Sequence, residues 1–301
     1  MSSPIAVLSA LHWSHLCAEF ARIDVRIRRE VRRWVLAGQD PNDDYRGMYI
    51  TQEEAQTLLE RPFGVSWGQW IELPTEEESV FHQQHIQAEA QAEATAQELT
   101  AQGETPRLQQ LAANFGLDRT ALDIFLLCIA PAFDTKYERL YGYLQDNVTK
   151  RRPSVRLLLD LLGQPGAAQF ELADYLTGDS PLFKHGLLEQ VIEPPPANGH
   201  WLNQTLHADE TVIAWLRGHY EHHGPLEGHV SLTTSTITEM EHVLAGEAIA
   251  NLNLLNHTDD LLLALHGADQ TRQDAAARLL ANARQQPLLT VDIKPLIGEQ
   301  T

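Results

Sequence analysis

The chain has 301 residues, of which 43% are apolar, so it can bury more than one core and cannot be disordered throughout. Its 41 acidic and 22 basic residues give a formal net charge of −19, which excludes a surface that is basic overall and adapted to nucleic-acid phosphates. No apolar run is long enough to span a bilayer, the start of the chain lacks an export signal, and Cys17 and Cys128 form no C-x-x-C pair, so we expect a cytoplasmic protein that does not bind membranes.

Residues 1–74 are predicted to form an N-terminal helical region. Its first helical pattern ends near Gly38 and carries six arginines between positions 22 and 33. Arg26, Arg29 and Arg33 in this cluster could bind an anionic partner. The alternative, which we favour, is the polar face of an amphipathic helix whose apolar stripe faces a core and whose arginines have acidic neighbours.

A short helix starting at Thr51 is predicted next, because Glu54 completes a capping-box pattern. Large aromatic side chains follow beside helix-breaking residues in this stretch. Phe63, Trp67 and Trp70 are expected to fill a core rather than to line a ligand site.

Residues 75–104 are rich in glutamate, glutamine and alanine and contain few large apolar residues. Helix propensity is high in this stretch, but there is little to bury. We expect an acidic helical connector that separates the N-terminal region from the next domain.

Residues 105–225 are predicted to form a winged-helix domain. Four apolar stripes at helical spacing begin it: Leu108, Leu111, Ala112 and Phe115; Leu122, Phe125, Leu126 and Ile129; Tyr137, Leu140, Tyr141 and Leu144; Val155, Leu158, Leu159 and Leu162. Apolar segments at 187–192 and 201–206 then flank a proline-rich loop at 194–199, the pattern of a β-wing. A helix capped by Asp209 follows.

Residues 226–301 show a different order of elements. A helix is expected within 235–255, then an apolar strand at 259–267, a helix at 272–284 and a second strand at 287–293. This order predicts a short right-handed β-loop-α-β unit of a parallel sheet. The whole chain is therefore predicted to be mainly α-helical with a small α/β portion.

The loop after the predicted strand at 259–267 is compared with the phosphate-binding pattern G-x-x-x-x-G-K-[ST]. Gly267 matches the first glycine, whereas Arg272, Gln273 and Asp274 replace the second glycine, the lysine and the hydroxyl residue; Thr271 lies within the loop. Either the loop is a degenerate nucleotide-binding loop or it is an ordinary turn between a strand and a helix. In both cases the lysine charge is missing and an acid stands where Mg²⁺ would be held.

The region from Pro106 to Leu162 resembles the winged-helix domain of a group of bacterial AAA+ ATPases, several of which accompany contractile injection systems. The resemblance rests on LAANFGL at 111–117, LLCIAP at 126–131 and YGYLQDNVTKRRP at 141–153. It implies that a degenerate AAA+ module starts near 226 and that the catalytic acids, sensor and arginine finger lie beyond Thr301. It also implies a protein partner or an AAA+ assembly, with room for an oligomer, and ATP with Mg²⁺ only in the complete parent protein.

From this resemblance we expect a recruitment or regulatory part of such an ATPase that binds proteins and, alone, neither hydrolyses ATP nor needs a cofactor. A winged-helix DNA-binding regulator is the alternative, because Lys150, Arg151 and Arg152 precede a helix and could bind an anionic partner. A nucleotide sensor without hydrolysis is the second alternative. Specific nucleic-acid binding is not expected at this net charge. The histidines at 219, 222, 223 and 229 lack a defined ligand spacing, so we expect no metal site.

Overall fold

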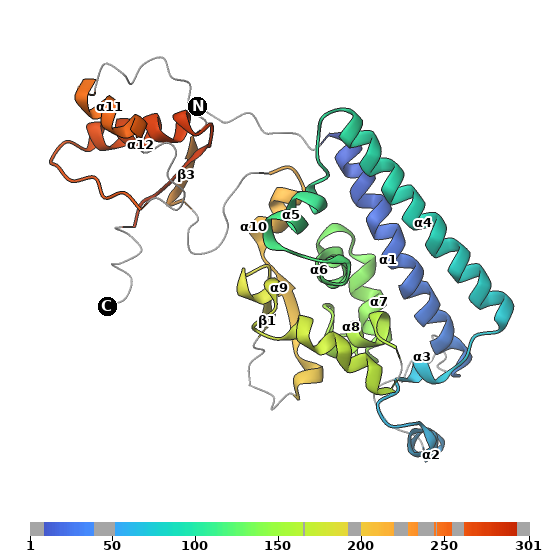
Figure 1. Ribbon diagram of the computed structural model, residues 1–301. Helices are drawn as coiled ribbons and strands as arrows, with labels where there is room; N and C mark the ends of the chain where they lie inside the picture. Colours follow the sequence, from blue (N-terminus) through green and yellow to red (C-terminus); the bar gives the residue numbers. More distant parts are fainter. Residues whose placement is uncertain are drawn as a thin grey trace. The chain divides into compact units, whose positions relative to one another are not determined.

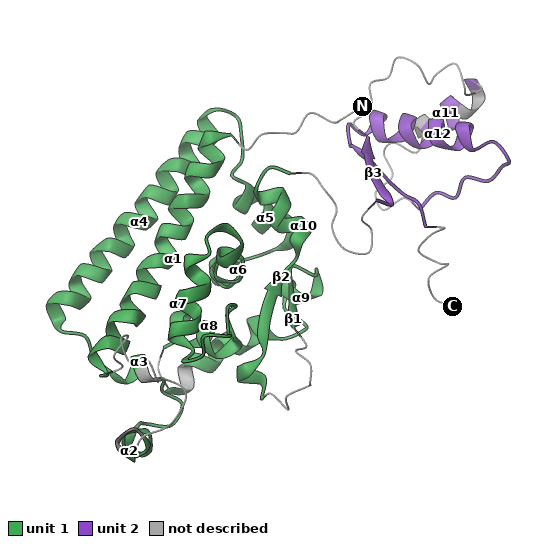
Figure 2. Cartoon of the chain, turned by 180° about the vertical axis from the view of Figure 1, so that it is seen from behind, with its two compact units in different colours: residues 1–220 green, residues 221–301 purple. Residues whose placement is uncertain are grey.

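The computed structural model describes residues 9–38, 52–164, 166–191, 200–219, 228–233, 244, 246–254 and 262–293. Contacts between residues divide the chain into two compact units, residues 1–220 and 221–301 (Figure 2). This division lies near the boundary expected at 225/226. The further boundaries expected at 74/75 and 104/105 stay predictions.

The larger unit is mainly helical, which confirms the predicted fold class. Its α-helices are α1 Ala10–Leu36, α2 Gln52–Glu60, α3 Trp67–Trp70, α4 Thr75–Ala101, α5 Arg107–Phe115, α6 Arg119–Phe133, α7 Lys136–Leu144, α8 Val155–Leu162, α9 Pro181–Lys184 and α10 Glu210–Leu216. Two 3-10 helices, η1 Gly166–Leu176 and η2 Trp201–Asn203, and two strands, β1 Leu188–Val191 and β2 Thr205–Ala208, complete it.

Helices α1 and α4 run side by side in opposite directions (Figure 1). Ser9 caps α1, and the predicted apolar stripe of this helix is confirmed because Ile23, Ile27 and Trp34 are buried. On α4 the buried residues are Ala92, Thr95, Ala96 and Leu99.

The sequence of 75–104 led us to expect little buried surface, and α4 buries more than that. Large apolar residues are few on α4, but small side chains let two helix backbones approach closely, and Leu99 is fully covered. Counting large apolar residues therefore underestimates the contact that α4 makes with α1.

Helix α6 lies at the centre of the larger unit. Every residue from Ala121 to Ala130 is buried, as expected for a helix that other elements surround. Asp118 caps it by accepting a hydrogen bond from the Ala121 amide at 2.8 Å. The four predicted stripes are confirmed, since their residues are buried or partly buried in one apolar core.

Strands β1 and β2 form an antiparallel pair in which Leu188 lies opposite Ala208 and Val191 opposite Thr205. At its other edge, β2 forms one isolated antiparallel bridge, between Thr205 and Ser154. A two-stranded wing is present as predicted, but its second strand is Thr205–Ala208 and not 201–206, because Trp201–Asn203 form a 3-10 helix. The predicted loop at 194–199 lies outside the described residues.

The turn before α3 differs from the prediction of an aromatic core. Phe63 is 99% exposed and Trp70 is only partly buried, so Phe63 does not fill the core. Gly68 is what the close packing here requires: a Cβ at this position would lie 1.8 Å from Oε1 of Glu30 and 2.8 Å from Cδ1 of Trp34.

The smaller unit contains β3 Val230–Thr233, α11 Gly246–Leu254, α12 Gln270–Ala283 and β4 Leu288–Val291. The helix and the second strand predicted at 272–284 and 287–293 correspond to α12 and β4. Their arrangement is not the predicted parallel β-loop-α-β unit, because β4 pairs with β3 in antiparallel register.

Residues 262–266 form no strand, and Leu262 is 97% exposed; residues 259–261 lie outside the described residues. An apolar strand of a parallel sheet needs covered faces and paired edges. The described part of this unit offers a single strand pair, β3 with β4, and neither strand pairs with 262–266.

Candidate interaction sites

The cationic residues singled out from the sequence do not form one surface. Arg26 and Arg29 line a pocket beside α1 and α4, whereas Lys150, Arg151 and Arg152 line a separate groove beside the wing. Arg33 lies 3.7 Å from Glu30 on the same helix.

Among the residues that the structure describes, all the arginines of α1 except the exposed Arg28 are paired with acids from α1, α4 or α6. Arg29 donates to both carboxylate oxygens of Glu78, at 3.0 and 2.5 Å, and Arg32 does the same with Glu77, at 2.7 and 2.9 Å. Such two-pronged pairs fix α4 in register on α1. The arginine-rich face of α1 is therefore largely engaged inside the protein.

A second set of ion pairs is buried between α1 and α6. Arg22, 1% exposed, donates to both oxygens of Asp123, one of them at 2.9 Å, and its Nε donates to Glu19 at 3.1 Å. Arg119 reaches Glu19 at 2.8 and 3.0 Å. Burial by itself raises the pKa of Glu19, but the hydrogen bonds and charges of Arg119 and Arg22 outweigh it, and the pKa is lowered.

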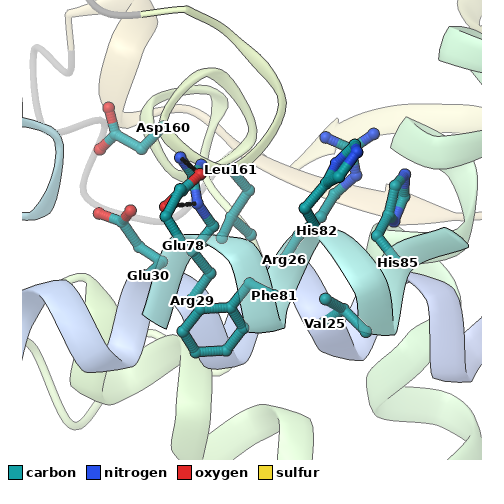
Figure 3. Close-up of a pocket in the computed structure, with 10 residues that line it drawn as sticks. All are labelled: Val25, Arg26, Arg29, Glu30, Glu78, Phe81, His82, His85, Asp160 and Leu161. Atoms are coloured by element: carbon teal, nitrogen blue, oxygen red, sulfur yellow. Dashed lines mark hydrogen bonds and ion pairs between the residues drawn. The ribbon is translucent and has the colours of Figure 1, made fainter. Parts of the chain in front are cut away.

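The pocket lined by Arg26 and Arg29 has a volume of about 190 Å³ and lies between α1, α4 and the end of α8. Figure 3 shows Glu30 and Asp160 together at one end, and Arg26, His82 and His85 at the other. The pair of Arg29 with Glu78 lies between the two ends.

The acidic end of this pocket holds two carboxyl groups with perturbed pKa values. Burial, and then the nearby charge of Asp160, raises the pKa of Glu30 to about 7. Burial also raises the pKa of Asp160 to about 6, although Arg156 contacts that carboxylate at 3.0 Å and opposes the shift. Within the pocket, Arg29 is paired with Glu78, and the carboxylate of Asp160 is paired with Arg156, so part of its charge is already neutralised by neighbours.

The groove beside the wing is larger, with a volume of about 470 Å³. The loop at 149–152 forms one side of it. The other lining residues come from α6, α7, both wing strands and α10. Six of them are apolar or weakly polar, Cys128, Pro131, Ala132, Val191, Ala208 and Ile213, and four are polar or acidic, Glu138, Thr205, His207 and Glu210. Arg151 and Arg152 are exposed, and the side chain of Arg151 is 71% exposed and 3.8 Å from Glu138. These guanidinium groups are open to solvent at the edge of a hollow that apolar, polar and acidic side chains line together.

Local hydrogen bonds hold the 149–152 loop in place. Gln145 donates to the carbonyl of Arg152 at 3.0 Å and accepts from the Ser154 amide at 3.1 Å. Asn147 accepts from the Thr149 amide at 2.9 Å. The loop therefore presents its cations from a fixed backbone, which lowers the entropy cost of binding.

Helix α8 follows this loop, and it is the helix that the DNA-binding alternative would place in the major groove. Five of its eight residues are buried: Val155, Leu157, Leu158, Leu159 and Leu161. Arg156 is paired with Asp160 one turn further along. A recognition helix must present an exposed face to the major groove, and α8 is a core helix.

The loop compared with a phosphate-binding loop precedes α12 in the smaller unit. Asp269 caps α12, and its carboxylate accepts from the amides of Thr271 and Arg272 at 3.1 and 3.2 Å. In a phosphate-binding loop, amides at this helix start face the phosphates. Gln273 donates to the Gly267 carbonyl at 2.8 Å, and Asp274 pairs with Arg278 at 2.7 Å. The five residues compared with the phosphate-binding pattern therefore lie close together: Gly267, Thr271, Arg272, Gln273 and Asp274. These hydrogen bonds and ion pairs, however, join the five residues to each other or to Asp269 and Arg278.

Neither a metal-binding cluster nor a membrane-spanning helix is found in the part of the chain that the structure describes. It contains no cluster of three metal-binding side chains, and none of its helices is long and apolar enough to cross a membrane. His222 and His223 lie outside the described residues.

A helical core followed by a two-stranded antiparallel wing defines a winged-helix protein. The chain belongs to the family described as "Winged helix domain, variant", whose model matches residues 10–228, more than half of its length. The match includes α1 and α4 as well as the wing. No curated protein and no solved structure matches the chain.

Proposed function

We propose that this chain is a protein-interaction module that binds its partner through the groove beside the wing. The observation that carries the proposal is the presence of exposed Arg151 and Arg152 at a partly apolar hollow of about 470 Å³. Apolar floors with polar rims are typical of protein interfaces, in which arginine is enriched.

A protein partner fits these observations better than DNA. Winged-helix domains serve both uses, but DNA readers present an exposed, basic helix, and α8 is buried and ion-paired. The three cations of the loop at 150–152 stand on a chain of net charge −19, which repels a nucleic-acid backbone at longer range.

We further propose that the module is a recruitment or regulatory part of a AAA+ ATPase of the injection-system group, without hydrolysis of its own. The resemblance at 106–162 supports this assignment. The carboxylate of Asp269 supports the absence of hydrolysis, because it accepts from the Thr271 and Arg272 amides that a bound phosphate would approach.

The test places a photo-crosslinking amino acid at position 151 in cells, with position 28, an exposed arginine of α1, as the matched control. We expect a protein to be captured from position 151 alone. The captured protein is then purified and its affinity measured; Arg151→Glu should weaken it at least tenfold, and Arg28→Glu should not. Capture of DNA in place of protein, or equal effects of the two reversals, would refute the proposal.

A further inference from the structure

Helix α2 and the turn after it carry exposed apolar side chains. Leu59 is 88% exposed and Phe63 is 99% exposed, and Ala55, also exposed, lies four residues before Leu59. This spacing puts Ala55 and Leu59 on one face of the helix. Both views show α2 standing off from α1 and α4 (Figures 1 and 2). We call residues 52–64 the α2 segment.

The sequence of the α2 segment is acidic as well as apolar. It contains Glu53, Glu54 and Glu60, and Arg61 as its only basic residue. Leu59 on α2 and Phe63 in the turn after it are exposed apolar side chains beside Glu60, a combination found in helical segments whose apolar anchors enter a hollow and whose charges meet its edge.

The groove beside the wing has the opposite character. Its lining combines apolar side chains with three cations, Lys150, Arg151 and Arg152, and the two acids that also line it, Glu138 and Glu210, leave the cations in excess. Among the described residues that line it, none belongs to the α2 segment, so a chain does not fill this groove with its own helix.

We propose that the α2 segment of one copy docks into the groove beside the wing of a second copy, with Leu59 and Phe63 on the groove's apolar lining residues and Glu60 facing the cationic loop. The proposal rests on the proposed function, for which it names the partner. We choose a second copy as the occupant because the same chain carries both the acidic, apolar α2 segment and a groove with a cationic loop. Since the two surfaces are different, the contact is head-to-tail and leaves one free half at each end of the assembly.

The contact must also overcome the general repulsion between two chains of net charge −19. The attraction is local, between groups at the edge of the groove, so salt screens both it and the repulsion. At high salt only the apolar contribution to the contact remains. Because salt weakens attraction and repulsion together, reversing the charges of the loop tests the contact more directly than a salt titration does.

The experiment uses complementary variants of the full chain. Leu59→Asp/Phe63→Asp removes the α2 anchor, and Arg151→Glu/Arg152→Glu removes two cations of the loop. Both pairs are exposed, so folding should persist, and circular dichroism checks it. Light scattering across a concentration series should show self-association of the natural chain, and each variant alone should weaken it by about 30-fold or more, the effect of losing a hot-spot side chain.

Mixing the two variants gives the decisive result. One variant retains the groove and the other retains the α2 segment, so the mixture should form a dimer of one copy of each and no larger species. Arg28→Glu, the control, should associate like the natural chain. A natural chain that stays monomeric, or a mixture that does, overturns the proposal. The crosslinking test at position 151 would then still identify a different partner, so the two proposals can fail separately.

Discussion

Replacing Glu30 by glutamine should make the larger unit more stable at neutral and alkaline pH. Glu30 is 3% exposed, its Oε1 accepts a hydrogen bond from Nε1 of Trp34 at 3.2 Å, and Asp160 lies close enough to disfavour its charge. Glutamine has nearly the same shape and keeps the acceptor for Trp34, but it carries no charge.

The magnitude follows from the pKa of this group. Burial and Asp160 raise the pKa of Glu30 from 4.5 to about 7. Because the folded chain holds this proton more tightly than the unfolded chain, its contribution to stability is complete below pH 4.5 and is lost as the pH rises through 7. One pKa unit corresponds to about 1.4 kcal/mol, so the total loss is roughly 3 kcal/mol.

Urea unfolding followed by tryptophan fluorescence measures this effect in one unit alone, since all six tryptophans lie within residues 1–220. The difference in unfolding free energy between Glu30→Gln and the natural chain should be small at pH 4.5 and approach roughly 3 kcal/mol at pH 8. Glu98→Gln, at an exposed position of α4, is the control for the loss of one negative charge.

The reasoning would be refuted by a difference that does not change between pH 4.5 and pH 8. It would also be refuted if Glu98→Gln gave the same curve, because the effect would then come from net charge. A variant that is less stable at every pH would show that Glu30 acts as a charged partner of Arg33, at 3.7 Å, and not as a buried acid.

Three further predictions concern packing, buried charge and hydrolysis. Gly68→Ala should cost about 1–3 kcal/mol in urea unfolding, because its Cβ would lie 1.8 Å from Oε1 of Glu30, whereas Gly178→Ala, with open space around it, should change little. Asp123→Ala leaves the buried guanidinium of Arg22 with Glu19 alone and should cost about 3 kcal/mol; an equally stable variant would contradict the role of this pair. The purified chain should release no phosphate from ATP above background, and hydrolysis that Asp274→Ala abolishes would count against the proposed function.

The helical core could be predicted from the sequence because apolar spacing reports burial directly. Leu126, Tyr141 and Leu158 are each fully or almost fully buried, as their stripes predict. Caps were equally readable: Asp118, Asp209 and Gly116 end or begin helices by contacts with residues a few positions away. Each of these features depends on short stretches of chain.

Features that join distant stretches could not be predicted. The pairs of Arg29 with Glu78 and of Arg22 with Asp123 link residues 49 and 101 positions apart, and no local pattern specifies such a choice. Pairing of β3 with β4 replaced the expected parallel unit for the same reason. Of the candidate site, the sequence indicated the cations at 150–152, whereas the apolar lining residues come from four elements that only the fold brings together.

The buried pair between Arg22 and Asp123 has a practical consequence for work with shorter recombinant fragments. A fragment that begins at residue 105 would keep the wing and all the helices after α4, yet it would expose the surface of α6 that α1 covers and leave Asp123 without its guanidinium. Such a piece would be expected to aggregate or to remain partly folded, because apolar side chains of α6 that α1 covers would be exposed to water. An autonomous folding unit for crystallisation or binding assays should therefore start at α1, where the family match also starts.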